Sequence, residues 1–264
     1  KQDKVLYHTA AVIASNYLVS LMAQSEDLLQ DIGLKREHIL PLVQGTLANI
    51  ADHGRSALTG PIRRGDWSTV TQHIQALAER FPDLLPSYFA MGRYTARLAA
   101  RPWPPDLPPP PKILAWPDLS RTVEAMKRRG LTIVFTNGCF DIIHAGHVAY
   151  LAQARALGDC LILGLNSDAS VKRLKGPERP INDQLSRAAV LAGLESIDYI
   201  AVFEEDTPFN IIDLVRPHIL VKGGDWQVEN MVGADIVRAC GGQVMTIPFK
   251  DGHSTTGILE KLKE

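Results

Sequence analysis

Two histidines at the end of a β-rich run carry the clearest chemical signal in this chain of 264 residues. His144 and His147 flank Gly146, and a helical pattern from Val148 to Leu157 follows them directly. A helix that begins after a strand directs free N–H groups and the positive end of its dipole toward the strand end, which suits a phosphate group. The glycine lets the backbone approach a ligand, and the imidazoles add hydrogen-bond donors. The pattern predicts a phosphate-binding site; its alternative is a histidine pair that only caps the helix.

The loop before these histidines adds candidates for the same site. It reads Asn-Gly-Cys-Phe-Asp from Asn137 to Asp141 and connects the β-rich run to the histidines. Ligands of open α/β sheets bind beyond the carboxyl ends of the strands. We therefore expect Gly138, Phe140 and Asp141 to line the site.

A basic segment bounded by glycine and proline follows the second β-rich run. It extends from Lys172 to Pro180, shortly after Asn166 and Asp168 close that run. Glycine and proline interrupt regular elements, so this segment is predicted to be a mobile loop. Lys175 and Arg179 carry the charges with which such a loop closes over a polyphosphate. A solvated charged loop without a ligand is the alternative.

Three later segments place polar groups at the ends of predicted elements. One is a helix for which Asn182 or Asp183 is the expected N-cap. Another is the Lys-Gly-Gly-Asp block after the fourth β-rich run, and the last is a hydroxyl cluster at a helix start, where hydroxyls either cap the helix or hold phosphate. The candidate contacts in these segments are Arg187, Lys222, Asp225, Ser254, Thr255 and Thr256.

A proline-rich stretch separates two unlike halves of the chain. Residues 101–111 favour an extended polyproline geometry and are predicted to be a semi-rigid linker. Residues 1–100 show apolar positions only at helical spacing, which predicts an all-helical domain. Residues 112–264 alternate β-rich and helical segments, which predicts an α/β domain with a parallel sheet and helices on both faces. The segments behind these predictions are helical 12–29, 39–50 and 70–77, and β-rich 132–135, 160–165, 199–203, 218–221 and 243–247.

Composition restricts the classes of partner. The net charge of −1 lacks the basic excess of duplex-binding proteins, so no nucleic-acid partner is expected. The longest apolar runs are far shorter than the roughly 20 residues that span a bilayer, so no membrane association is expected. Cys139, Cys160 and Cys240 are too few and too scattered for a disulfide framework or a zinc site, and we expect each to be a small buried hydrophobe. These features, with no secretory signal at the start, predict a soluble cytoplasmic protein.

The order of these motifs resembles the cytidylyltransferase-like superfamily, whose hallmark is His-x-Gly-His after the first strand. From about Lys112 onward the chain is similar to the adenylyltransferase domain of the bifunctional heptose enzymes of lipopolysaccharide precursor synthesis. The closest stretches are 137–159, 165–180, 203–208 and the Lys-Gly-Gly-Asp block. The resemblance implies a Rossmann-like nucleotidyltransferase that uses ATP, Mg²⁺ and D-glycero-β-D-manno-heptose 1-phosphate and releases ADP-heptose and diphosphate.

The same resemblance implies roles for particular residues. It places His144 and His147 on the nucleotide phosphates, with Lys175 and Arg179 on the polyphosphate. It makes Asp141 a residue that positions the sugar phosphate or the metal. The hydroxyl cluster near the end of the chain adds contacts, and the metal ligands stay unassigned. No protein nucleophile is required, because nucleotidyl transfer depends chiefly on positioning and on charge neutralisation.

The helical half resembles a domain of uncharacterised function that follows a Rossmann domain in proteins related to ketopantoate and pyrroline-carboxylate reductases. The similarity covers about Tyr7 to Leu98 and includes the segment from Ala57 to Trp67. Within this chain Gly60 and Gly65 are expected to shape a turn, and Asp66 to cap the next helix. The domain is expected either to pair subunits through its apolar faces, giving a homo-oligomer, or to belong to a fusion with an NAD(P)-dependent reductase.

Three other functions stay open at this point. A cytidylyltransferase for a polyol or glycerol phosphate shares the His-x-Gly-His site, because spacing does not reveal the base. A non-catalytic scaffold that only senses nucleotide is another possibility. A fragment of a reductase fusion is the third.

Overall fold

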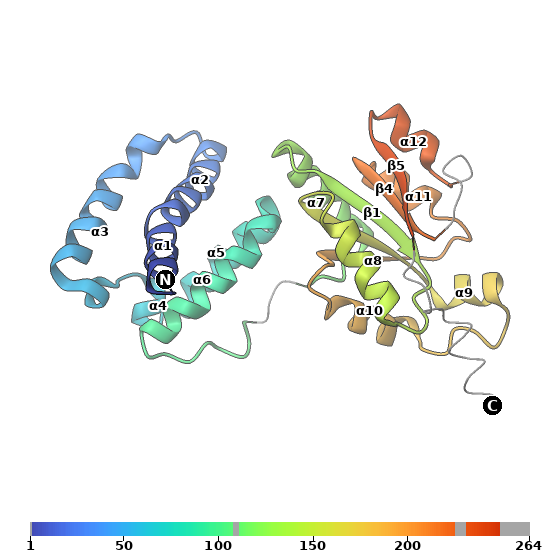
Figure 1. Cartoon of the computed structure of the whole chain (residues 1–264), viewed down its shortest axis with the longest axis horizontal. Helices are drawn as coiled ribbons and strands as arrows, with labels where there is room; N and C mark the ends of the chain where they lie inside the picture. Colours follow the sequence, from blue (N-terminus) through green and yellow to red (C-terminus); the bar gives the residue numbers. More distant parts are fainter. Residues whose placement is uncertain (1, 108–110, 225–230, 249–264) are drawn as a thin grey trace. The chain divides into compact units, whose positions relative to one another are not determined.

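The structure is a computed structural model that describes residues 2–107, 111–224 and 231–248 (Figure 1). Within it the chain forms two compact units, one helical and one α/β. The helical unit comprises Lys1–Ile74 and Pro86–Pro108, and the α/β unit comprises Gln75–Leu85 and Pro109–Glu264.

The helical part contains only helices and turns among residues 2–107, which confirms the predicted all-helical region. Asp66 caps α5, because its carboxylate accepts hydrogen bonds from the backbone N–H of Thr69 at 3.2 Å and from the hydroxyl of Ser68 at 2.9 Å. Gly60 and Gly65 have φ values of 94° and 75°, as the predicted turn requires. The elements are α1 Gln2–Ala14, α2 Asn16–Asp31, η1 Arg36–His38, α3 Leu40–His53, η2 Gly54–Ala57, α4 Pro61–Arg64, α5 Trp67–Arg80, η3 Pro82–Leu84 and α6 Leu85–Leu98.

One helical stretch departs from the expectation drawn from apolar runs. From Asp3 to Asp31, α1 and α2 together form 29 residues that are long and apolar enough, by length and composition, to cross a membrane. Short polar interruptions hid this property in the sequence. Core helices of soluble proteins and signal sequences share it, so the finding is weak evidence of a membrane span.

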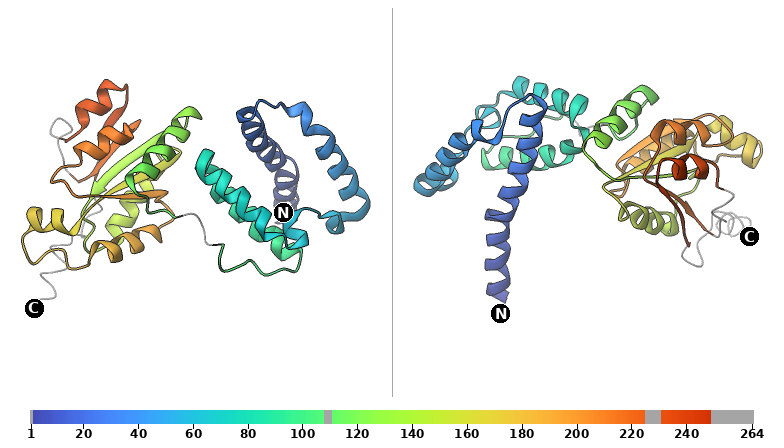
Figure 2. Two further views of the ribbon diagram at one scale, coloured as in Figure 1. Left: turned by 180° about the vertical axis from the view of Figure 1, so that it is seen from behind. Right: turned by 90° about the horizontal axis from the view of Figure 1, so that it is seen from above.

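The α/β unit is built on a five-stranded parallel sheet with strand order β3-β2-β1-β4-β5 (Figures 1 and 2). The order reverses between β1 and β4, which makes the carboxyl ends of these strands the topological switch point. The predicted parallel sheet is confirmed. The elements are α7 Trp116–Arg128, β1 Ile133–Gly138, α8 Ala145–Arg155, β2 Cys160–Asn166, α9 Asp168–Lys175, α10 Gln184–Ala192, β3 Tyr199–Phe203, α11 Phe209–Val215, β4 Ile219–Gly223, α12 Ala234–Ala239 and β5 Gln243–Ile247.

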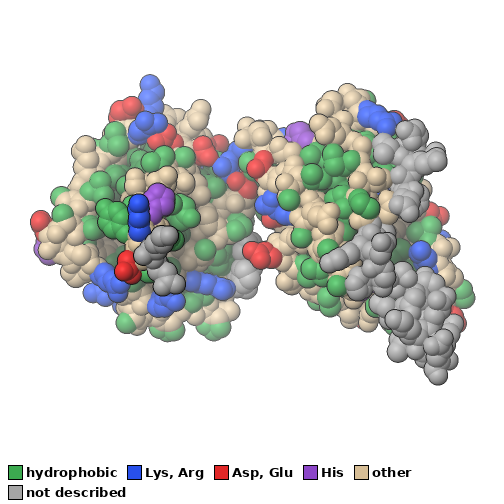
Figure 3. Space-filling model, in the orientation of Figure 1, with side chains coloured by type: hydrophobic (Ala, Val, Ile, Leu, Met, Phe, Trp, Pro, Cys, Tyr) green, Lys and Arg blue, Asp and Glu red, His purple; other side chains and the backbone are tan. Residues whose placement is uncertain are grey.

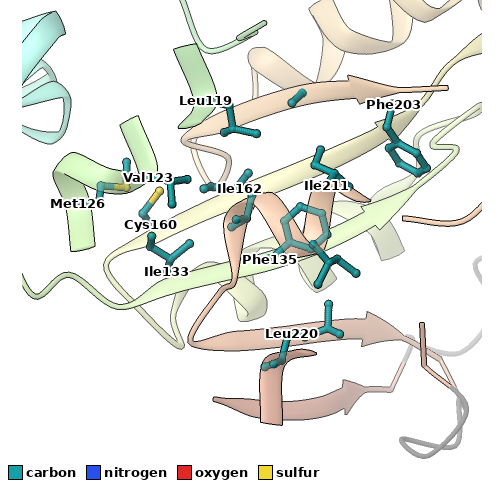
Figure 4. Close-up of a cluster of buried hydrophobic side chains, with 14 residues drawn as sticks. Leu119, Val123, Met126, Ile133, Phe135, Cys160, Ile162, Phe203, Ile211 and Leu220 are labelled. Carbon is teal, nitrogen blue, oxygen red and sulfur yellow. The ribbon is translucent and has the colours of Figure 1, made fainter. Parts of the chain in front are cut away.

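Alternate residues of the central strands pack into two cores, one on each face of the sheet. Phe135 faces α7, α11 and α12, in a cluster with Leu119 and Ile211 (Figure 4). Val134, one residue earlier, faces α8 and α10 in a second cluster with Leu151. Successive side chains of a strand point to opposite faces, so the two clusters confirm helices on both faces.

At the amino-terminal ends of the strands, side chains accept hydrogen bonds from backbone N–H groups. Asp159 accepts from the N–H of Thr132 at 2.8 Å, and Asp198 accepts from the N–H of Leu161 at 2.8 Å. His218 Nδ1 accepts from the N–H of Ile133 at 2.9 Å. These bonds satisfy donors at the starts of β1 and β2 that the ladders leave unpaired.

The prediction of a basic loop from Lys172 to Pro180 is wrong in its first half. The residues up to Lys175 are the end of helix α9, and the loop begins at Gly176, which has a φ of 98°. Ser167 is the reason, because its side chain accepts a hydrogen bond from the N–H of Ser170 and caps a helix that the sequence pattern did not predict. The next helix, α10, has Asp183 as its N-cap, one of the two predicted residues.

Candidate active site

A cavity of about 610 Å³ opens at the carboxyl ends of the strands, where the strand order reverses. Its size is typical of a small-molecule site. It is the place predicted from the sequence for the phosphate-binding residues. Its lining consists of Asn137, Gly138, Cys139, Phe140, Asp141, His147, Tyr150, Asn166, Leu174, Lys175, Arg179, Asp206, Thr207, Pro208, Lys222, Gly223, Met231 and Val232.

The loop between β1 and α8 is held in a tight conformation. Phe140 has a φ of 45°, in the left-handed region that residues other than glycine rarely adopt. Its ring lies over Gly138, where an added Cβ would come within 2.9 Å of the ring, and 5.2 Å from the ring of His147. Strained backbone of this kind clusters at functional sites. Gly138 is thus needed because the Phe140 ring occupies the space of a side chain.

The two predicted histidines stack on each other at the start of α8. Their ring centroids are 3.9 Å apart with an interplanar angle of 27°. His144 is the N-cap residue of α8, and its carbonyl accepts from the N–H of His147 at 2.9 Å. Burial, and then the neighbouring His144, lower the pKa of His147 to about 4. His147 is therefore a neutral imidazole at neutral pH, with one N–H to donate.

Asp141 ties the β1–α8 loop to the loop after α9. One carboxylate oxygen accepts from Arg179 Nε at 2.6 Å, and the other accepts from the N–H groups of Ile181 at 2.7 Å and Asn182 at 3.1 Å. The carbonyl of Asp141 also accepts from the side chain of Asn182. The Asp141 side chain is 3% exposed, against 21% for Arg179. This geometry makes Asp141 an anchor of the Arg179 loop.

Arg187 lies beneath the cavity and not in it. Its side chain is 1% exposed, and its guanidinium donates to Asp168 at 2.8 Å. It also donates to the carbonyls of Cys139 at 2.5 Å, Asn166 at 2.9 Å and Asn182 at 3.0 Å. These bonds join α10 to the β1–α8 loop, to the β2–α9 junction and to the residue before its own N-cap. Neither Arg187 nor its partner Asp168, both predicted to contact ligand, lines the cavity; their bonds hold the segments that surround it.

Lys222 reaches the cavity from the end of β4. Its Nζ donates to the carbonyl of Asn137 at 3.1 Å, across the switch point. Burial lowers the pKa of Lys222 to about 8. An ammonium held in low dielectric attracts an anionic ligand strongly.

Tyr150 is one cavity residue that the motifs did not reveal. Its hydroxyl lies 2.6 Å from Thr136 Oγ1 and donates to the carbonyl of Val221 at 3.2 Å, which links α8 to β1 and β4. Burial raises the pKa of Tyr150 to about 12, so the phenol stays protonated. Asp206 and Thr207 were also missed; their place after a predicted strand was the available signal. The other missed residues are Asn137, Cys139, Leu174, Pro208, Gly223, Met231 and Val232.

The remaining candidates divide by position. Asn166 lines the cavity, and its side chain donates to Ser170 Oγ at 3.0 Å. Gly146 is buried in the first turn of α8, next to the histidine pair. The candidates Asp225, Ser254, Thr255 and Thr256 lie outside the described residues.

The cysteines and possible metal ligands qualify two expectations. All three cysteines are free, but only Cys160 is buried; Cys139 is half-buried in the cavity wall and Cys240 is exposed. Among the described residues, no group of three or more His, Cys, Asp or Glu side chains is placed to hold a metal ion. The described part of the site therefore supplies no complete metal cage.

Comparison with known proteins agrees with this geometry. The chain is 58% identical over 146 residues to the bifunctional protein HldE of Trichlorobacter lovleyi, a match that covers 55% of this chain and 30% of that protein. It is 56% identical over 151 residues to the bifunctional protein HldE of Syntrophotalea carbinolica, covering 57% and 31%. The chain thus spans about a third of the length of these relatives.

A solved structure and two family models complete the comparison. The lipopolysaccharide core biosynthesis protein from Thermoplasma volcanium GSS1 aligns with 27% identity and a TM-score of 0.38, over 46% of this chain and 98% of that one. Residues 1–95 match a domain of unknown function, DUF2520, which confirms the resemblance found for the helical half. Residues 135–260, which contain the His-x-Gly-His motif and most of the cavity lining, match the cytidylyltransferase-like model.

Proposed function

We propose that this chain transfers AMP from ATP to D-glycero-β-D-manno-heptose 1-phosphate, giving ADP-heptose and diphosphate. The observation that carries the proposal is the 58% identity to HldE across the segment that forms the cavity. The bifunctional heptose enzymes have this activity in their adenylyltransferase domain, which is the part that the chain resembles. A cavity with Lys175, Arg179 and Lys222 in its wall suits two phosphorylated substrates.

In the proposed reaction an oxygen of the sugar phosphate attacks the α-phosphorus of ATP. The new P–O bond forms as the bond between the α-phosphorus and its bridging oxygen breaks, and diphosphate leaves with the electron pair. Neutral His147 donates an N–H to the nucleotide phosphates, with His144 stacked against it. Lys175 and Arg179 neutralise the departing diphosphate. Preorganised donors of this kind stabilise charge that develops in the transition state.

Mg²⁺ is proposed to arrive with ATP. Mg²⁺ commonly keeps several waters and binds substrate phosphates with one or two carboxylates, so no protein cage is needed. This fits the absence of a three-ligand cluster among the described residues. The ion supplies charge neutralisation on the triphosphate. Two carboxylates that line the cavity already have partners in the protein. Asp141 accepts from Arg179 and from two backbone N–H groups, and Asp206 accepts from Arg173.

The reaction is tested with purified protein, Mg²⁺ and pairs of substrates. ATP with the heptose 1-phosphate is expected to release diphosphate at least about a hundredfold faster than CTP with glycerol phosphate, because a pocket built for one base leaves polar groups unpaired with another. Faster turnover of CTP with a polyol phosphate would make the chain a cytidylyltransferase. Binding of ATP without turnover of any pair would favour the nucleotide-sensing scaffold.

We also propose that the helical domain, residues 1–100, joins copies of the chain into a homo-oligomer, with residues 101–111 as linker to the transferase domain, 112–264. Large apolar side chains are exposed on this region, and Figure 3 shows hydrophobic side chains at its surface. Tyr7 is 78% exposed, Val19 69% and Leu42 68%. Monomeric proteins rarely leave large apolar patches uncovered.

The oligomer is tested by sedimentation of the wild-type chain and of the Val19→Asp and Leu42→Asp variants. The wild type is expected to sediment as a multimer and the variants as monomers, all without detergent. A wild-type monomer, or a protein that partitions into vesicles, would contradict the proposed soluble, cytoplasmic oligomer. A negative result with duplex DNA is expected from the charge balance.

A further inference from the structure

One polar atom in the cavity wall is left without a partner. Among the described residues, the side-chain oxygen Oδ1 of Asn137 is buried and accepts no hydrogen bond. A buried carbonyl oxygen that lacks a donor costs free energy, so such atoms are rare in folded proteins unless a water or a ligand completes them. The atom lies at the end of β1, on the strand next to the switch point.

The surroundings of Asn137 keep its side chain at the cavity. Its backbone carbonyl is already occupied by Lys222 Nζ at 3.1 Å. Across the ladder it pairs with Gly164 of β2, where an added Cβ would lie 3.2 Å from Asn137 Cβ. A side chain at position 164 would therefore crowd both the Phe135 ring and the Asn137 side chain. Asn137 and Lys222 both line the cavity.

We infer that Asn137 is a substrate-binding residue whose side-chain oxygen accepts a hydrogen bond from an O–H or N–H group of a bound substrate. A carbonyl oxygen accepts and does not donate. The phosphate groups of the substrates also act as acceptors, so they do not satisfy it. The ligand part that does is a sugar hydroxyl or the exocyclic amine of the base. The inference rests on the proposed nucleotidyl transfer and adds a contact beyond the phosphates.

Three variants separate this role from the alternatives. Asn137→Leu removes the acceptor at similar volume, and Asn137→Asp keeps an acceptor while removing the amide N–H. Asn210→Leu is the control, since Asn210 is an exposed residue of α11 whose amide donates to Glu205 at 2.9 Å, outside the cavity. Thermal melts check that all three are folded.

The measurement is equilibrium binding of Mg-ATP, Mg-ITP and heptose 1-phosphate, each alone, to wild type and variants. Asn137→Leu is expected to weaken one of the two natural substrates about tenfold, whereas Asn137→Asp and Asn210→Leu stay within about threefold of wild type. A loss of affinity confined to heptose 1-phosphate identifies a hydroxyl of that sugar as the partner of Asn137. Loss confined to ATP, with ITP bound alike by wild type and the leucine variant, identifies the amine; equal loss for both nucleotides identifies a ribose hydroxyl.

Two results would overturn the inference. One is unchanged affinity of Asn137→Leu for every ligand. The other is equal weakening of all three ligands by Asn137→Leu, because the loss of one hydrogen bond to one substrate does not produce it. A wild type that binds ATP but not heptose 1-phosphate would instead contradict the proposed sugar substrate. The nucleotide titrations would still decide the role of Asn137.

Discussion

Asp141 holds the guanidinium of Arg179 through Nε at 2.6 Å and is itself almost fully buried. This pairing orients a cation of the cavity wall before any substrate arrives. If Asp141 acts through Arg179, substitutions at the two positions are not additive. We expect Asp141→Asn and Arg179→Ala each to lower kcat/KM for ATP about tenfold or more, and the double variant to be no worse than Arg179→Ala. Steady-state kinetics at saturating heptose phosphate measures kcat/KM for the wild type, the two single variants and the double variant.

A metal-binding role for Asp141 predicts a different outcome. Losses that multiply in the double variant, together with a raised Mg²⁺ requirement for Asp141→Asn, would show that the carboxylate acts without Arg179. Asp213→Asn is a matched control, because Asp213 forms an exposed ion pair with Arg216 at 2.9 Å away from the cavity.

Arg187 is expected to support the fold more than it binds ligand. Arg187→Met leaves three carbonyls without their donor, so we expect a loss of about 2–4 kcal/mol in the free energy of unfolding. Arg173→Met is the comparison, since Arg173 makes an exposed pair with Asp206 and its loss should cost about 1 kcal/mol or less. Denaturant titration measures both; equal costs would contradict the role given to Arg187.

His147→Ala is expected to abolish most activity while the fold persists. Losing one preorganised donor typically costs about a hundred- to a thousandfold in rate. His218→Ala should show the reverse, a lower melting temperature with retained kcat/KM, because His218 accepts from Ile133 at the far edge of the sheet. Turnover and melts on both variants decide it; an active His147→Ala protein would refute the assignment.

The lowered pKa of His147 predicts how stability depends on pH. The ordinary value is 6.5, and the folded state holds it at about 4. Between these two values the unfolded chain binds the proton and the folded chain does not, so stability falls as the pH falls through this window. His147→Asn should lose less melting temperature than wild type between pH 7 and pH 4.5, by about 2–4 °C. Parallel melting curves would contradict the shift.

The sequence predicted the elements better than the side-chain contacts. Strands β3 and β5 have the predicted bounds, because short β-rich runs between helical segments are a local signal. His147 and Lys175 line the cavity, where the resemblance to the family placed them. The roles of Asp141 and Arg187 could not be predicted, since their partners lie 38 to 48 residues away in the chain, at Arg179 and Cys139. Helix α9 was missed because its cap, Ser167, depends on the backbone angle at the strand end.

The carboxyl-terminal and the amino-terminal ends of the strands differ in what a substitution there is expected to affect. The cavity residues of the strands lie at their carboxyl-terminal ends. At the amino-terminal ends, Asp159, Asp198 and His218 accept hydrogen bonds from backbone N–H groups. Substitutions at the amino-terminal ends of the strands are therefore expected to change the melting temperature of the domain and to leave the choice of substrate intact.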